Sequence, residues 1–226
     1  MSRLDGKIVV AVDGPAGVGK STLAIGLARE FHLTYVETGA RYRAIGWVAR
    51  ERGISPDDEA ALAAIAATLP IEFSLEGELN RVILDGRDVT TLLRSPEMGP
   101  LASQVSAKPK VRSALLDRQR EFAKLGGTVA EGRDIGTVVF PDAHVKFFLT
   151  ADVEERAHRR YLQLQDAGED VSMAQLIEEI GTRDRQDSGR AVAPLKAAAD
   201  AIIVDTTHLS VEGVLDVLRE HVRRAL

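Results

Sequence analysis

The stretch from Ile8 to Thr22, IVVAVDGPAGVGKST, decides the fold. Its beginning, Ile8 to Val12, is apolar without alternation, which is typical of a strand buried on both faces. The following GPAGVGKS, from Gly14 to Ser21, fits the pattern G-x-x-x-x-G-K-[ST], and a helical pattern begins near Lys20. In such a unit, glycines let backbone N–H groups turn toward phosphate oxygens, and the helix N-terminus adds partial positive charge. The stretch therefore predicts a loop that binds nucleotide phosphates.

Two side chains of this loop have expected roles. Lys20 would contact the outer phosphates of ATP, and the Ser21 hydroxyl would help to hold Mg²⁺, directly or through water. The alternative is a flexible turn without a ligand, which the strand before the loop and the helix after it disfavour. The predicted ATP-binding residues are Gly14, Pro15, Ala16, Gly17, Val18, Gly19, Lys20, Ser21 and Thr22.

The rest of the chain alternates between strand and helix signals, which predicts the α/β class with a parallel sheet. Further short strands are expected at Thr34–Val36, Thr128–Ala130, Val145–Leu149 and Ala201–Val204. Helical patterns cover Lys20–Phe31, Arg41–Arg52, Lys110–Leu125, Val153–Gln165, Ala174–Asp184 and Val211–Leu226.

An insert with a different pattern is expected between Gly53 and Leu101. It begins with a small Ala-rich helix over Pro56–Leu69. Short alternating segments follow, and together they predict an antiparallel patch. These predicted strands are Ile71–Ser74, Arg81–Asp85 and Val89–Leu92.

Composition excludes several classes of function. The chain has 226 residues and no cysteine, which excludes a disulfide scaffold, a thiolate metal site and a cysteine nucleophile, and suits a cytoplasmic location. Its longest hydrophobic run, Ala60–Ala67, is far too short to cross a membrane. A net charge of −5 argues against binding a nucleic acid polymer through bulk charge. The five histidines have no metal-ligand spacing.

A GTP switch is disfavoured because the only asparagine, Asn80, is followed by Arg81, so the guanine-binding Asn-Lys-x-Asp loop is missing.

Three other clusters carry possible chemistry. TGARYR, residues 38–43, follows a strand and opens a helix, so it could bind a second anion or could simply cap the helix. EGRDIG, residues 131–136, follows the central strand, where doubly wound sheets bind ligands; a local Arg–Asp pair is the alternative. Arginines gather between 156 and 190, where a mobile helical lid could bring their planar donors to a phosphoryl group, although a solvated helix face would have the same composition. The lid arginines considered catalytic, together with Lys20, are Arg156, Arg159, Arg160 and Arg183.

Together these motifs resemble the bacterial cytidylate kinases, a family of P-loop nucleoside monophosphate kinases. The resemblance extends from about residue 7 to residue 218. Its most specific parts are GRDIGTVVFPDA and the RDxxDSxR pattern. The matching stretches are VDGPAGVGKST (12–22), ETGARYRA (37–44), ASQV (102–105), AEGRDIGTVVFPDA (130–143), RDRQDSGR (183–190) and Pro194-Leu195.

The resemblance implies a single P-loop kinase domain over residues 1–226. It has a five-stranded parallel sheet with helices on both faces, an antiparallel acceptor-binding insert at about 53–101 and a helical lid at about 152–190. It also implies transfer of the ATP γ-phosphoryl group to CMP or dCMP with Mg²⁺, by a cytoplasmic monomer. Thr38, Arg112, Asp134 and Arg190 would contact cytosine; Ser103, Arg183 and Asp187 the pentose; Arg43 and Arg133 the acceptor phosphate; and Tyr42 belongs to the same acceptor motif.

The family pattern is not matched everywhere. Glu37 and Thr38 stand where Asp or Ser is common, and Arg41 stands where an apolar residue is usual. These departures bear on the affinity for the acceptor and on the preference between CMP and dCMP. Separately, two alternatives stay open: another small-acceptor kinase, UMP-accepting or shikimate-type, and a non-catalytic nucleotide-binding regulatory module. The second needs no second anion site, so the paired arginines Arg43 and Arg133 argue against it.

Overall fold

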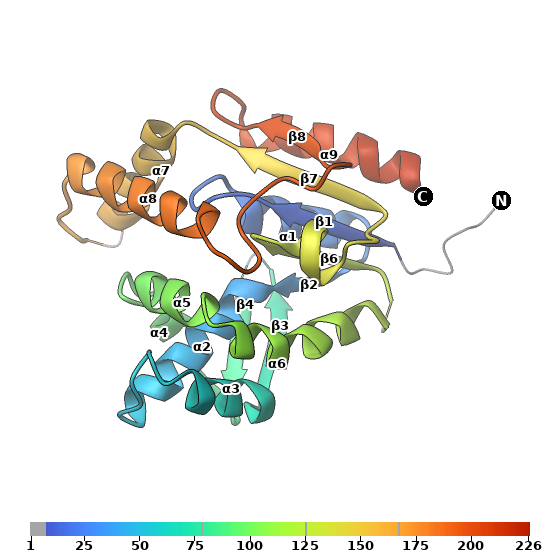
Figure 1. Ribbon diagram of the computed structural model, residues 1–226. Helices are drawn as coiled ribbons and strands as arrows, with labels where there is room; N and C mark the ends of the chain where they lie inside the picture. The colour runs from blue at the N-terminus through green and yellow to red at the C-terminus, as the bar shows by residue number, and fades with distance from the viewer. Residues whose placement is uncertain (1–7, 78, 125, 167) are drawn as a thin grey trace. The chain divides into compact units, whose positions relative to one another are not determined.

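A computed structural model describes residues 8–77, 79–124, 126–166 and 168–226 (Figure 1). These residues form two compact units, one made of residues 8–34 and 126–226 and the other of residues 35–124. Lys7 and Leu125, which end two of the predicted ranges, lie outside the described residues. Each unit is described by itself below.

The first unit is built on a parallel sheet whose central strand is β1 (Val9–Asp13). The strand from Thr128, which was predicted to be central, is its neighbour. Val10 of β1 pairs in register with Val129 of β6 (Thr128–Gly132) and with Val145 of β7 (Val145–Thr150). The full order is β2-β6-β1-β7-β8, where β2 is Thr34–Glu37 and β8 is Ile202–Asp205. Val10, Ala11 and Val12 are fully buried, which explains why β1 has no alternation of apolar and polar residues. The predicted α/β class with a five-stranded parallel sheet is confirmed.

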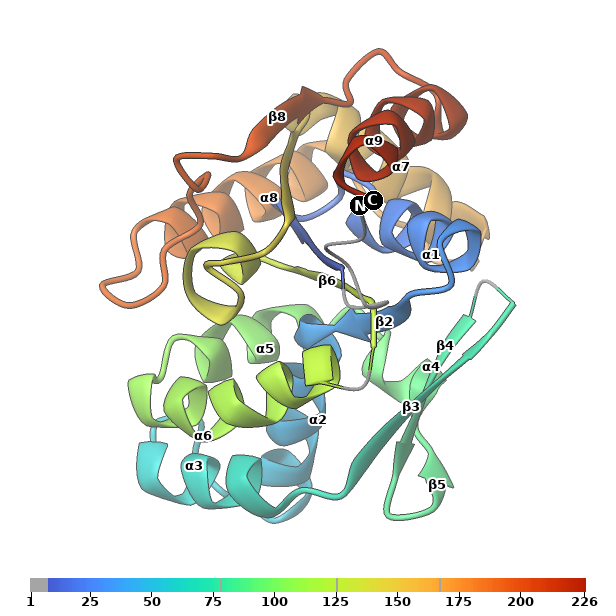
Figure 2. The ribbon, with the colours of Figure 1, turned by 90° about the vertical axis from the view of Figure 1, so that its right-hand side faces the viewer.

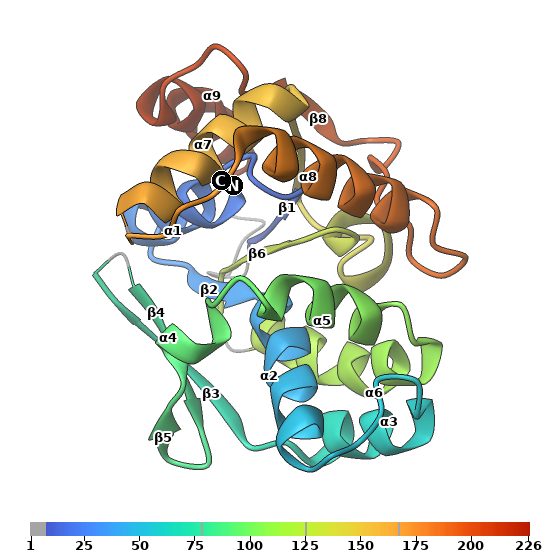
Figure 3. The same ribbon diagram turned by 90° about the vertical axis from the view of Figure 1, so that its left-hand side faces the viewer.

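Four α-helices accompany this sheet. Helix α1 (Lys20–Glu30) follows β1 and packs against α9 (Val211–Ala225), as Figure 2 shows. Helices α7 (Val153–Asp166) and α8 (Met173–Ser188) lie side by side (Figure 3). They share a small apolar cluster made of Ala157, Leu164, Leu176 and Ile180. A short π-helix, Ile135–Val139, follows β6 and was not expected from the sequence, because its five residues have no distinctive pattern.

The second unit is mostly helical, with one small antiparallel sheet. Its core is formed by fully buried residues such as Ile45, Leu62, Leu93, Met98 and Leu115. The helices are α2 (Thr38–Glu51), α3 (Glu59–Thr68), α4 (Thr90–Leu93), α5 (Met98–Ser106) and α6 (Pro109–Arg120), followed by the 3₁₀-helix Glu121–Lys124. The sheet consists of β3 (Ile71–Glu76), β4 (Leu79–Leu84) and β5 (Arg87–Asp88) in that order.

One predicted element of the insert is wrong. Val89–Leu92 is not a strand, because β5 ends at Asp88 and α4 begins at Thr90. The Thr90 hydroxyl accepts from the Val82 N–H at 2.9 Å, and the Asp88 carboxylate accepts from the Thr90 N–H at 2.9 Å. Side-chain oxygens thus satisfy amides that a longer β-ladder would have paired.

Helix α5 was missed because Gly99 and Pro100 interrupt its helical pattern. Both residues fall in the first turn of the helix, where a proline removes no needed hydrogen bond. The helix then packs closely on α2 at Gly46, where an added Cβ would lie 2.6 Å from Leu101 Cγ. Only glycine permits this approach.

Candidate phosphate-binding site

The loop between β1 and α1 has the backbone that its glycines predict. Gly14 has φ +151°, and a Cβ at this position would lie 2.4 Å from the carbonyl oxygen of Leu149. Gly17 and Gly19 also have positive φ, +81° and +90°. Side chains at these three positions would clash or strain the backbone. The sequence therefore adopts the tight turn needed for backbone amides to face an anion.

Lys20, the first residue of α1, is a buried cation with its side chain directed back along the loop. It is 6 % exposed, and its Nζ donates to the carbonyl oxygen of Pro15 at 2.6 Å. Burial, followed by the positive charge of Arg133, lowers the pKa of Lys20 to about 7, although the Glu131 carboxylate acts in the opposite direction. Because anionic phosphate would favour the ammonium form, the site is electrostatically suited to a phosphate ligand.

Ser21 and Glu131 form a pair of hard oxygen donors beside Lys20. The Ser21 hydroxyl donates to Glu131 Oε1 at 2.6 Å. Glu131 lies near the end of β6, in register with Val12 of β1. Glu131 opens the EGRDIG motif, but no individual role was predicted for it. The sequence shows an acidic residue at the end of a buried strand. Its position beside the phosphate loop depends on the order of the strands in the sheet, which the sequence does not determine.

Three predicted site residues converge on one buried carboxylate. Asp187 is 1 % exposed; its Oδ2 accepts from Arg133 Nε at 2.7 Å, and its Oδ1 accepts from Arg190. Burial alone would raise the pKa of Asp187, but Arg133 and Arg190 outweigh burial and leave it below its usual value. Arg183 contributes positive charge to both Asp187 and Lys20. Asp134 lies next to Arg133 in the chain and is also buried.

Two of the other predicted catalytic arginines, Arg156 and Arg159, bond α7 to its surroundings in this structure. Arg156 is buried and donates to the carbonyl oxygens of Ala151 at 3.0 Å and Ala16 at 3.2 Å, and it pairs with Asp184. Arg159 donates to the Thr206 carbonyl at 2.6 Å and pairs with Glu155 on its own helix. Arg160 is half-buried and lies 3.5 Å from Gln163. Arg156 thus connects the predicted lid with the phosphate loop.

The remaining candidates lie in the second unit. Thr38 is the buried first residue of α2, and Ser103 is buried on α5. Arg112 of α6 lies over the ring of Tyr42, with its Cζ 5.6 Å from the ring centroid. Arg43 pairs with Glu37, whose second oxygen accepts from Asn80 Nδ2 at 3.1 Å.

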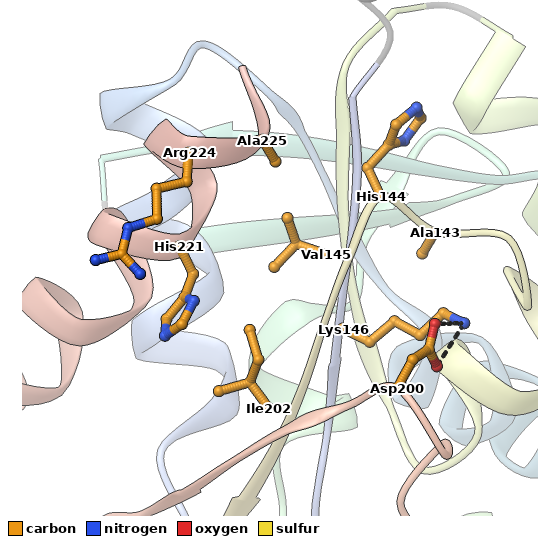
Figure 4. Close-up of a pocket in the computed structure, with 9 residues that line it drawn as sticks. All are labelled: Ala143, His144, Val145, Lys146, Asp200, Ile202, His221, Arg224 and Ala225. Atoms are coloured by element: carbon orange, nitrogen blue, oxygen red, sulfur yellow. Dashed lines mark hydrogen bonds and ion pairs between the residues drawn. The ribbon is translucent and has the colours of Figure 1, made fainter.

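A polar pocket in the first unit is separate from the phosphate loop. It has a volume of about 200 Å³ and is lined by residues that include His144, Lys146, Asp200 and His221 (Figure 4). Its lining includes Val145 and Ile202, the first residues of β7 and β8, so it lies at the opposite end of the parallel strands from the loop. Lys146 points at Asp200 and donates to both of its oxygens. The charge within the pocket is thus largely satisfied.

The described residues contain neither a preformed metal-binding cluster nor a membrane-spanning helix. Within residues 8–77, 79–124, 126–166 and 168–226, no group of three or more His, Asp or Glu side chains could hold a metal ion by itself. In the same ranges, no helix combines the length and apolar character that crossing a bilayer requires.

Comparisons with known proteins give one consistent family. The model of the family described as "Cytidylate kinase" matches residues 10–224. A cytidylate kinase of Citrifermentans bemidjiense is 48 % identical over 97 % of this chain and 94 % of its own length. One of Pseudomonas putida is 49 % identical over 95 % of each chain. A crystal structure of an uncharacterized protein from Eubacterium ventriosum covers 96 % of this chain and 99 % of its own, with TM-score 0.53 and 11 % identity, so it shows the fold alone.

Proposed function

The chain belongs to the cytidylate kinase family, and we propose which of its residues transfer the γ-phosphoryl group of ATP to CMP or dCMP. The activity makes the chain a phosphotransferase that handles two polyanions at once. The nucleophile is an ionised phosphate oxygen of the acceptor, so no general base is required. Catalysis then depends on positioning the two nucleotides and on neutralising their charge.

The donor nucleotide is bound by the loop of residues 14–22. Its backbone amides and the N-terminus of α1 contact the phosphates, and Lys20 contacts the outer ones. Lys20 exchanges its bond with the Pro15 carbonyl for a phosphate oxygen, which raises its pKa and fixes its charge. Arg156, Arg159, Arg160 and Arg183 stabilise the charge that develops during transfer. Without nucleotide, Arg156 and Arg159 donate to backbone carbonyl oxygens.

Ser21 and Glu131 fit the magnesium ion that ATP brings. Both offer hard oxygen donors, the ligands that Mg²⁺ prefers, and they lie 2.6 Å apart beside the loop. Mg²⁺ prefers few protein ligands together with water and substrate phosphates, so a pair of donors is sufficient. When bound, the ion would neutralise charge on the β- and γ-phosphates.

The acceptor nucleotide is assigned to the remaining predicted site residues. Arg43 and Arg133 bind its phosphate, and the residues named next bind its sugar and base. Thr38, Arg112, Asp134 and Arg190 contact the cytosine, with Tyr42 supporting Arg112, and Ser103, Arg183 and Asp187 hold the pentose. A carboxylate suits cytosine because N4 is a donor, and arginine suits its O2 and N3 acceptors.

The observation that carries this proposal is the gathering of cations around Lys20. After burial, the charges of Arg133 and Arg183 lower the pKa of Lys20, while Glu131 and Asp13 raise it; all of these groups belong to one compact unit. Cations held at one site in a folded protein favour the binding of an anion, and the phosphates of the two nucleotides supply the negative charge. We extend the proposal to the insert at about 53–101 as part of the acceptor-binding region and to residues 152–190 as the lid. Monomeric state and cytoplasmic location stay predictions.

The test is acceptor choice, measured by coupled ADP release with CMP, dCMP, UMP, AMP and shikimate. UMP would place its O4 acceptor against the Asp134 carboxylate and its N3 donor against a guanidinium. Two unsatisfied buried groups at about 1 to 3 kcal/mol each disfavour UMP by about 30-fold to 10⁴-fold in kcat/KM. Asp134→Asn should narrow that gap, because an amide presents either a donor or an acceptor.

The matched control is Asp142→Asn, which changes an exposed carboxylate of the same sequence motif and should leave the ratio unaltered. Equal use of CMP and UMP by the unmodified protein would contradict the base assignment. Shikimate as the preferred acceptor would contradict the acceptor class itself, and nucleotide binding without turnover would favour the regulatory module.

A further inference from the structure

Asp13, the last residue of β1, makes contacts that neither the sequence motif nor the proposed chemistry uses. Its side chain is buried, with 3 % of the residue exposed. Oδ1 accepts from the Ile135 N–H at 2.8 Å, and Oδ2 accepts from the Gly136 N–H at 2.7 Å. Both oxygens are thus bonded to consecutive backbone amides of a segment that is 122 residues away in the chain.

These two amides belong to the start of the π-helix Ile135–Val139. The first N–H groups of any helix lack partners within that helix, and a buried N–H without an acceptor costs free energy. The helix has no side-chain cap from Asp134, the residue that precedes it. Asp13 supplies the acceptors from a different strand, and so the direction in which the turn leaves β6 depends on it.

The position of Asp13 connects two loops that the proposed function places in contact with different nucleotides. On one side, Asp13 directly precedes Gly14, the first residue of the phosphate loop. On the other, it pairs in register with Gly132, which directly precedes Arg133 and Asp134. The Asp13 side chain is short and buried, and it is held by two hydrogen bonds. A displacement of either loop is therefore transmitted to the other.

We propose that Asp13 is a positioning residue that fixes Arg133 and Asp134 in the orientation needed to bind the acceptor nucleotide. This inference rests on the proposed function, because it takes from there the roles of Arg133 and Asp134. Asp13 itself contacts neither nucleotide. Its effect passes through the backbone of Ile135 and Gly136, which holds the end of the loop on which the two acceptor-binding side chains stand.

The electrostatics of Asp13 agree with such a role. Burial raises its pKa to about 6, while its bonds to Gly136 and Ile135 act in the opposite direction. Asp134 raises the pKa further and Lys20 lowers it. The two oxygens of a carboxylate can accept from both amides at once, which offsets the cost of burying its charge. An asparagine would offer one acceptor and turn an NH₂ group toward the second N–H.

The experiment compares Asp13→Asn with Asp205→Asn in the whole chain. Asp205 is a matched control, because it is also the last residue of a strand of the main sheet and its exposed carboxylate accepts a backbone N–H, from Thr207 at 2.9 Å. Asp13→Asn should raise KM for CMP about tenfold or more and reduce the preference for CMP over UMP, while KM for ATP changes by less than about threefold. Asp205→Asn should change none of these. Equal increases in KM for ATP and CMP, or no change in either, would overturn the inference.

Hydrogen exchange of the unmodified protein decides the question even if Asp13→Asn fails to fold. The Ile135 and Gly136 amides should be strongly protected without any nucleotide, because Asp13 already bonds them. Fast exchange at both amides would refute the inference. Arg133→Ala and Asp134→Asn separate this failure from failure of the proposed function. If neither variant alters acceptor use, the assigned roles are wrong; if both do and Asp13→Asn does not, only the role of Asp13 is wrong.

Discussion

Replacing Asp187 by asparagine should destabilise the ligand-free protein strongly, because one carboxylate neutralises two guanidinium groups. Asp187 is almost completely buried, and the Arg133 and Arg190 side chains are only 17 % and 9 % exposed. Breaking a buried ion pair by removing one partner typically costs about 3 to 5 kcal/mol. Asparagine keeps one acceptor oxygen, so we expect the lower end, about 3 kcal/mol. For a chain of this length that corresponds to a Tm lower by about 6 to 12 °C.

The pH dependence gives this prediction a second readout. Since the pKa of Asp187 is lowered in the folded protein, its contribution is fully present above its ordinary value of 3.8 and is lost as the pH falls through the lower folded value. The difference in unfolding free energy between wild type and Asp187→Asn should therefore be constant at neutral pH and shrink below about pH 4.

Urea unfolding without nucleotide, followed by circular dichroism, measures both effects. Glu220→Gln is the control, because Glu220 pairs with Arg224 on the exposed surface of α9 and its loss should cost less than about 0.5 kcal/mol. A loss below 1 kcal/mol for Asp187→Asn, or a difference that persists unchanged under acidic conditions, would refute the reasoning that Asp187 is the counter-ion of both arginines.

Three further outcomes follow from the same site. Lys20→Ala should lower kcat about 100-fold or more with unchanged circular dichroism, because Lys20 contacts charge that develops during transfer; near wild-type kcat would remove the loop from the mechanism. ATP binding at pH 8 should take up a proton, since the pKa of Lys20 lies near 7 before binding and rises beside phosphate; calorimetry should show heats that depend on the buffer at pH 8 but not at pH 6. Hydrogen exchange across residues 152–190 should slow when a bisubstrate analogue binds, and equal protection in both states would contradict a mobile lid.

The elements that local sequence determines were predicted well. The strand, loop and helix from Ile8 onward agree with β1 and α1 to within one residue at each end, because buried β-branched runs and glycine-rich turns act locally. All five predicted strands of the main sheet were found. Apart from the missed helix α5, the errors are Val89–Leu92 and the π-helix Ile135–Val139, where side chains from other elements satisfy the backbone. Such hydrogen bonds leave no periodic pattern in the sequence.

The arrangement of the candidate site was harder to predict from the sequence than the fold. The motifs identified Arg133, Asp187 and Arg190 separately, but their shared ion pair joins residues 54 positions apart and depends on the fold. Glu131 was missed for the same reason, since its neighbour Ser21 comes from another strand–helix unit. For Arg156 and Arg159, the sequence shows their spacing on a helix. Only the structure shows that their guanidinium groups donate to backbone carbonyl oxygens.

The pairing of Arg43 with Glu37 bears on how fast the enzyme can turn over. An arginine that already has a counter-ion gains less from an arriving phosphate, because the new ion pair replaces an existing one. The same exchange would favour dissociation of the nucleoside diphosphate product, because Glu37 can pair with Arg43 again when the product leaves. Asn80 Nδ2 donates to the other oxygen of Glu37, which holds the carboxylate beside Arg43. With the role proposed for Arg43, this pairing would lower the affinity for the acceptor and speed the release of the product.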